Sequence, residues 1–142
     1  MERERLRRYI DKLGHIEERI EDIRTWLAEF DEYSALDRKT RLAVYKAMQE
    51  AVEAATDIAA MILKDEGKLP QDDFMNIAQL WTLGIIDDHL KAALNEAGGL
   101  RNRLVHGYNG LNDVLALESI QNLLSPLGRF VSRVKEWVKS RA

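Results

Sequence analysis

Apolar residues recur through the first part of this chain at alternating steps of three and four, the spacing of one face of an α-helix. Arg and Glu are mixed on the other faces, as on a helix in contact with water. The pattern predicts a long helix over residues 6–30 with a narrow apolar seam that packs in a bundle or a dimer. The seam positions are Leu6, Ile10, Leu13, Ile16, Ile20, Ile23, Leu27 and Phe30.

A second long helix is predicted from Lys39 to about Asp65. Asp37, at the end of the connection 34–37, suits the N-cap position because its carboxylate accepts hydrogen bonds from the first turn. This helix is rich in alanine, so a neighbouring helix can approach it closely. Its apolar stripe is predicted at Leu42, Tyr45, Met48, Val52, Ala55, Ile58, Ala59 and Ile62.

The second half of the chain predicts shorter helices separated by breaks. A loop over 67–73 precedes short helices over 74–83 and 85–97, and the pair Gly98-Gly99 predicts a break or kink before a helical segment over 100–106. Gly107 and Asn109-Gly110 indicate a turn, and a last helix follows over 111–138, which Pro126 is expected to kink or divide. No strand pattern is present. The fold class is therefore all-α: one domain over 1–142, an up-and-down helical bundle with two long N-terminal helices.

Composition narrows the class of protein. The chain has 142 residues, 46% of them hydrophobic and 32% charged, which is typical of one globular domain. The absence of cysteine excludes disulfides, thiolate metal sites and a cysteine nucleophile. No signal-like segment and no apolar run of membrane-spanning length occurs, so we expect a cytoplasmic protein. The net charge of −3 argues against binding nucleic acid by bulk charge, though not against a small basic site.

The stretch 98–113 carries the chain's densest candidate chemistry. Arg101, Asn102, His106 and Tyr108 fall within eight residues of it. Asn102 and His106 are four apart and share a helical face, and the long stem of Arg101 allows its guanidinium to swing toward His106. Arginine binds phosphate and histidine moves protons near neutral pH, a combination that suits metal-independent RNA cleavage. The plainer interpretation is a surface pair in which His106 caps the end of a helix.

A few other polar residues need a role. Asp57 interrupts an Ala/Ile-rich stretch, so it is either the buried carboxylate partner of Arg101 or a partly exposed flank residue. Asp87, Asp88 and His89 predict a solvated face rather than a metal site, and we expect neither metal nor cofactor. His15 lies beside the apolar seam and is expected to be structural or exposed.

The segment Arg101-Asn102-x-Leu104-Val105-His106-x-Tyr108 resembles the Arg-x4-His-x-Tyr motif of the HepT-like branch of the HEPN superfamily. The runs 44–62 and 72–86 are also similar to that family, and the resemblance extends from about Leu42 to Trp137. It implies an α-helical, commonly dimeric, metal-independent ribonuclease toxin that pairs with a small nucleotidyltransferase antitoxin. Arg103 inside the motif, and 111–113 where an Ile-Asp pair is common, are mild departures.

The same resemblance implies roles for single residues. Arg101 and His106 would be the catalytic pair, Asn102 would orient the site, and Tyr108 would accept AMP from the antitoxin. A non-catalytic helical module that binds a nucleotide or a partner protein stays open as an alternative, as does a purely structural dimer. We also expect a homodimer, because helix 6–30 and the alanine-rich helix offer more apolar surface than a monomer buries.

Overall fold

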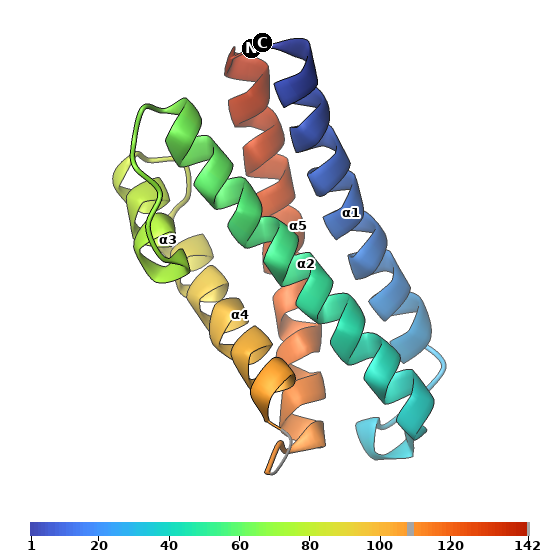
Figure 1. The fold of residues 1–142 in the computed structure, drawn as a ribbon. Helices are drawn as coiled ribbons and strands as arrows, with labels where there is room; N and C mark the ends of the chain where they lie inside the picture. The colour runs from blue at the N-terminus through green and yellow to red at the C-terminus, as the bar shows by residue number, and fades with distance from the viewer. Residues whose placement is uncertain (108–109, 142) are drawn as a thin grey trace.

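The computed structural model describes residues 1–107 and 110–141 of the chain. Within them the chain forms an up-and-down bundle of α-helices without a strand, as the hydrophobic periodicity predicted (Figure 1). The elements are α1 (Arg3–Leu27), the short 3-10 helix η1 (Tyr33–Ala35), α2 (Arg38–Asp65), α3 (Asp73–Thr82), α4 (Asp88–His106) and α5 (Asp113–Arg141). No helix in this part of the chain is long and apolar enough to cross a membrane.

The two chain ends and the motif segment lie at opposite ends of the bundle (Figure 1). The N-terminal amine of Met1 donates a hydrogen bond to the carbonyl of Arg141 at 3.1 Å. α1 packs on α2 and α5, α4 packs on α5 and α2, and the short α3 covers α2 and α4 from the side. The end of α4 and the start of α5 are therefore far from the termini and beside the beginning of α2 (Figure 1).

The inward face of α1 differs from the predicted seam at its N-terminal end. Ile10 was placed in the seam but is 57% exposed, and Tyr9 is fully buried in its place. Buried positions on α1 are Tyr9, Leu13, Ile16, Ile20, Ile23 and Leu27, which keeps strict steps of four and three. The Tyr9 hydroxyl donates to Asp65 at 2.6 Å, so a polar aromatic group is satisfied inside the core.

Aspartates begin three of the helices. Asp37 accepts from the Thr40 N–H at 3.2 Å, which confirms the predicted cap of α2. Asp72 caps α3 in the same way, and Asp87 caps α4 by accepting from Leu90 at 2.8 Å. The Asp87–His89 cluster, predicted as a solvated face, thus includes the residue that fixes where α4 begins.

Neither of two predicted interruptions divides its helix. α4 runs through Gly98-Gly99 without a break, because Leu94, Ala97 and Leu100 bury one face of it against the bundle and offset the glycine cost of about 1 kcal/mol each. Pro126 does not divide α5. The proline leaves the carbonyl of Asn122 without its helical partner, and Asn122 is exposed to water. Packing of the flanking buried leucines holds the helix together.

The apolar surface that predicted a homodimer is buried inside the chain itself. The seam of α1 and the alanine-rich stripe of α2 lie against one another and form much of the core. Leu42, predicted in that stripe, is instead 50% exposed. The large apolar side chains at the surface are Met1, Ile10, Leu42, Leu69, Phe74, Met75, Trp81, Val114 and Leu115.

Candidate active site

The last two turns of α4 carry Arg101, Asn102 and His106. Leu100 is fully buried and fixes the rotation of the helix, so that Arg101 lies at the edge of the core and Asn102 and His106 are exposed. Asn102 and His106 are four residues apart and share the solvent face, as the sequence predicted. Tyr108, the predicted modification site, lies outside the described residues.

Arg101 points toward α2 and α3. Its Nη2 donates to Asp73 at 3.1 Å, and its Nη1 lies 4.0 Å from a carboxylate oxygen of Glu53. Its Nε donates to the side-chain oxygen of Asn102 at 3.1 Å. The side chain is 20% exposed, so the guanidinium sits at a partly buried, polar junction of three helices.

The carboxylate partner expected for Arg101 was wrong. Asp57 lies one turn beyond Glu53 on α2, and its exposed carboxylate pairs with Lys12 of α1 at 3.3 Å. Asp57 is therefore a flank residue, the other interpretation that the sequence allowed. Every fourth position of this part of α2 carries a polar group, at Arg41, Tyr45, Gln49, Glu53 and Asp57. This pattern made Glu53 a candidate but could not show which of these residues faces Arg101.

His106 is the last residue of α4 and is exposed. It lies five positions after Arg101 on the helix, so the two side chains point about 140° apart around the helix axis. The expected swing of the Arg101 guanidinium toward His106 is not found, since its hydrogen bonds lead to Asp73 and Asn102. His106 and Arg103 lie in the last turn, where positive charge is favoured by the helix dipole.

Gly107 ends α4, and only glycine fits there. Its N–H donates to the Arg103 carbonyl at 2.7 Å, which closes the helix. A Cβ at this position would lie 2.4 Å from the same carbonyl oxygen, far inside van der Waals contact. The tight closure fixes the backbone directly after His106, the last residue of α4.

A polar contact anchors the far side of the motif segment. The hydroxyl of Tyr45 on α2 donates to Asp113, the first residue of α5, and Arg41 lies 3.5 Å from the same carboxylate oxygen. Burial raises the pKa of the Tyr45 hydroxyl and the bond to Asp113 raises it further, so the hydroxyl stays protonated and donating. Sequence reasoning noted 111–113 only as a departure from the family pattern and missed this contact.

A groove of about 510 Å³ opens between the end of α4 and the start of α5. Its walls are small or apolar apart from Arg103, Asn112 and Ser119, and they include Gly107, the residue after His106. The lining residues are Arg103, Gly107, Gly110, Leu111, Asn112, Leu115, Ala116 and Ser119. Within 1–107 and 110–141, no three His, Asp or Glu side chains gather in a group that could hold a metal ion.

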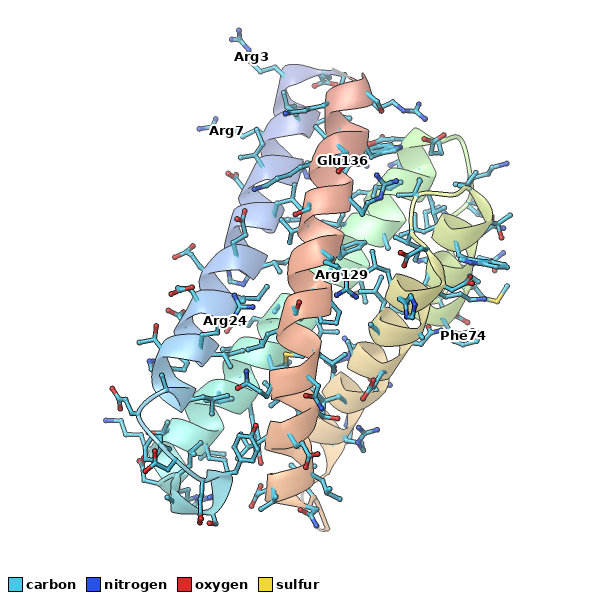
Figure 2. The ribbon with its side chains drawn as sticks, turned by 180° about the vertical axis from the view of Figure 1, so that it is seen from behind. Arg3, Arg7, Arg24, Phe74, Arg129 and Glu136 are labelled. Carbon is cyan, nitrogen blue, oxygen red and sulfur yellow. The ribbon has the colours of Figure 1, made fainter. Side chains whose placement is uncertain are left out.

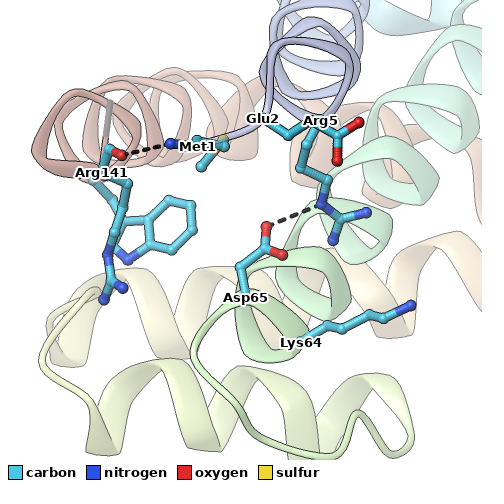
Figure 3. A pocket seen from close by; sticks show the side chains of 7 residues that line it. Met1, Glu2, Arg5, Lys64, Asp65 and Arg141 are labelled. Atoms are coloured by element: carbon cyan, nitrogen blue, oxygen red, sulfur yellow. Dashed lines mark hydrogen bonds and ion pairs between the residues drawn. The ribbon is translucent and has the colours of Figure 1, made fainter.

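A second hollow, of about 470 Å³, lies at the other end of the bundle, between the chain termini (Figure 3). Among its lining residues, Arg5 contacts Asp65 at 3.0 Å, and Arg141 pairs with Glu66 at the end of α2. Trp137 also donates to Glu66 at 2.8 Å, and this bond, with the nearby Arg141, holds the pKa of Glu66 below its usual value. These pairs tie the chain ends to α2 and lie far from the motif.

Comparison with known proteins identifies the class that this fold and motif define. The family model described as "Ribonuclease HepT-like" matches residues 16–134, nearly the whole bundle. Two proteins of Archaeoglobus fulgidus, named as candidate RNases, are 35% and 32% identical to this chain. The first alignment covers 93% of this chain and 94% of the relative, and the second covers 96% and 95%. The chain therefore belongs to the HepT-like ribonuclease family of HEPN proteins.

Solved structures of toxin–antitoxin complexes share the fold. A tri-AMPylated HEPN toxin of Shewanella oneidensis, in complex with its MNT antitoxin, superposes with a TM-score of 0.84 at 25% identity, covering 96% of this chain and 99% of that one. The toxin–antitoxin pair MntA–HpeT contains a chain that superposes with a TM-score of 0.81 at 25% identity, covering 91% and 98%. The resemblance found in the sequence thus extends to the whole bundle.

Proposed function

We propose that this protein is a metal-independent endoribonuclease toxin that cleaves RNA in the cytoplasm with Arg101 and His106. The observation that carries the proposal is their position on the last two turns of α4, in a chain of the HepT-like ribonuclease family. His106 is exposed, and Arg101 is partly exposed on another side of the same helix. Asn102 orients the guanidinium through the hydrogen bond at 3.1 Å.

The reaction follows from RNA chemistry. The ribose 2′-oxygen attacks the adjacent phosphorus, and its proton passes to the imidazole of His106. The bond from phosphorus to the 5′-oxygen then breaks, and the protonated imidazole returns the proton to that oxygen. The products are a 2′,3′-cyclic phosphate and a free 5′-hydroxyl. Arg101 stabilises the negative charge that builds on the phosphorane-like transition state. No step of this reaction requires a metal ion or a cofactor.

A homodimer completes this proposal. The Arg101 and His106 side chains of one chain leave α4 about 140° apart, so a second copy is needed to bring the cations of two motifs around one phosphate. The exposed Leu42 in the first turns of α2, and Val114 and Leu115 at the start of α5, give such an interface apolar surface. Sedimentation at micromolar concentration should give a dimer, and a monomer alone would contradict this part of the proposal.

We further propose that a small nucleotidyltransferase neutralises the toxin and can transfer AMP to Tyr108. The support is an AMPylated HEPN toxin that was solved in complex with an MNT antitoxin. This chain shares the fold of that toxin. Tyr108 is two residues from His106, so an added adenylate would obstruct the same phosphate site.

Expression in a host cell tests the proposal directly. The wild-type chain should arrest growth, the His106→Ala variant should not, and co-expression of a cognate small nucleotidyltransferase should restore growth. Purified protein that binds RNA without cutting it would favour the other interpretation, a non-catalytic nucleotide-binding module.

A further inference from the structure

The guanidinium of Arg101 is held by two carboxylates. Asp73 accepts a hydrogen bond from Nη2 at 3.1 Å, and Glu53 lies 4.0 Å from Nη1. Gln49 donates to Glu53 at 3.0 Å and so keeps that carboxylate in place. The side-chain oxygen of Asn102 accepts a hydrogen bond from Nε, the third nitrogen. Each nitrogen of the side chain thus faces an acceptor before any ligand arrives.

This arrangement has two opposite consequences for a phosphate. One guanidinium beside two carboxylates gives a local charge of about −1, which disfavours an approaching anion. The same contacts fix the orientation of the guanidinium fork, and an arginine already held in place stabilises a transition state without reorganising. Removing one carboxylate should therefore increase phosphate affinity and decrease the rate of the chemical step.

We propose that Asp73 is a positioning residue that orients Arg101 and competes with the RNA phosphate for its guanidinium, which limits substrate affinity in favour of turnover. This inference rests on the proposed ribonuclease activity. It assigns to α3, which carries none of the motif residues, a part in setting the balance between binding and rate.

Asp73 is available for this role because the fold does not need it. The adjacent Asp72 caps α3 through the Met75 N–H at 2.8 Å, so the helix keeps its cap without Asp73. Phe74, the next residue, points away from the bundle and is 64% exposed (Figure 2). The carboxylate of Asp73 is 45% exposed, and an ion pair so close to water contributes little to stability.

Two substitutions separate the two effects. Asp73→Asn removes the charge but keeps an oxygen that can accept from Arg101, whereas Asp73→Ala removes both. Affinity is measured with a short single-stranded 2′-O-methyl RNA, which lacks the attacking hydroxyl and cannot be cut. Both variants should bind it about five-fold more tightly at low salt, the effect of removing one nearby unit charge. The gain should shrink as salt is raised.

Cleavage of the matching unmodified RNA gives the second readout. We expect kcat to fall about ten-fold in Asp73→Ala and by a smaller factor in Asp73→Asn, with KM lowered in both. A residue with only a structural role would not lower KM, and the melting temperatures should stay close to wild type. Asp57→Asn is the matched control, because it removes a carboxylate from α2 that pairs with Lys12 instead of Arg101.

A double-mutant cycle decides whether the effect acts through Arg101. In an Arg101→Ala background, Asp73→Asn should no longer increase affinity. An equal gain in that background, or in Asp57→Asn, would show a general charge effect and overturn the proposal, as would unchanged affinity in both Asp73 variants. If the wild-type chain binds RNA but never cuts it, the ribonuclease proposal fails on its own, and the binding cycle still decides whether Asp73 competes for Arg101.

Discussion

The hydroxyl of Tyr45 on α2 donates a hydrogen bond to the carboxylate of Asp113, the first residue of α5. The two residues are 68 positions apart in the sequence, and Arg41 contacts the same carboxylate. The contact holds the start of α5, and with it the exit of the motif segment, against α2. It therefore links bundle stability to the geometry of the candidate active site.

Tyr45→Phe should reduce both stability and RNA cleavage. The lost hydrogen bond to a carboxylate is worth about 1–2 kcal/mol at a partly buried position, which urea unfolding can measure. Tyr9→Phe is the matched control, because Tyr9 makes the same kind of bond to Asp65 at the far end of the bundle. Tyr9→Phe should lower the unfolding free energy by a similar amount and leave RNA cleavage unchanged. Equal loss of cleavage in both variants would show that activity follows only stability.

Arg101→Ala and His106→Ala should each abolish RNA cleavage while the circular dichroism spectrum stays helical. Their losses should be of similar size, because residues that act as one unit are not additive. Arg101→Lys should also lose most activity, since a lysine cannot reproduce the planar fork that contacts Asp73 and phosphate together. Cleavage should persist in EDTA. Loss of activity with the chelator alone would contradict the metal-independent mechanism.

Gly107→Ala should disturb the end of α4. The new methyl group would lie 2.4 Å from the Arg103 carbonyl oxygen, so the backbone after His106 must move. We expect a loss of about 1–3 kcal/mol in stability and a reduced cleavage rate. Gly98→Ala is the contrasting change in the same helix, because a Cβ at Gly98 would meet no atom of a neighbouring element within 4 Å. It should raise stability by about 0.5–1 kcal/mol, and a loss there would contradict this account.

The stability of the bundle should fall in acid partly through Glu66. Its pKa in the folded chain is lowered, chiefly by the hydrogen bond from Trp137 and also by Arg141. A lowered folded pKa stabilises the fold above the ordinary value of 4.5, and this contribution is lost as the pH falls through the folded value. Glu66→Gln should therefore reduce the slope of the unfolding free energy against pH, measured between roughly pH 5 and pH 3. An unchanged slope in Glu66→Gln would contradict this prediction.

Co-expression with a cognate small nucleotidyltransferase should add AMP to Tyr108. Intact-mass analysis should show one or more added AMP units, and Tyr108→Phe should remove them. Modified protein should keep its melting temperature and lose RNA binding, because the added phosphate would compete with RNA for Arg101, the proposed phosphate-binding residue. Neutralised but unmodified protein would mean that the antitoxin inhibits by binding alone.

The local pattern was enough to predict which segments are helical and which residues carry the candidate chemistry. The steps of three and four in the first half, and Asp37 ahead of the second helix, each depend on neighbours within a few residues. The same holds for Arg101, Asn102, His106 and Tyr108, whose spacing alone resembled the family motif. Family membership is confirmed, while the roles of these four residues stay predictions.

Relationships between helices were decided only by the tertiary structure. Asp57 was one candidate partner of Arg101 because it interrupts an Ala/Ile-rich stretch. The packing of α3 beside α4 brings Asp73 there, and the rotation of α2 presents Glu53 instead. Burial of Leu94, Ala97 and Leu100 carries α4 through two glycines that favour a break. Which seam residues meet, and whether an apolar stripe remains for a second copy, depend likewise on long-range packing. Local propensity is worth about 1 kcal/mol per residue, and burial across the bundle outweighs it.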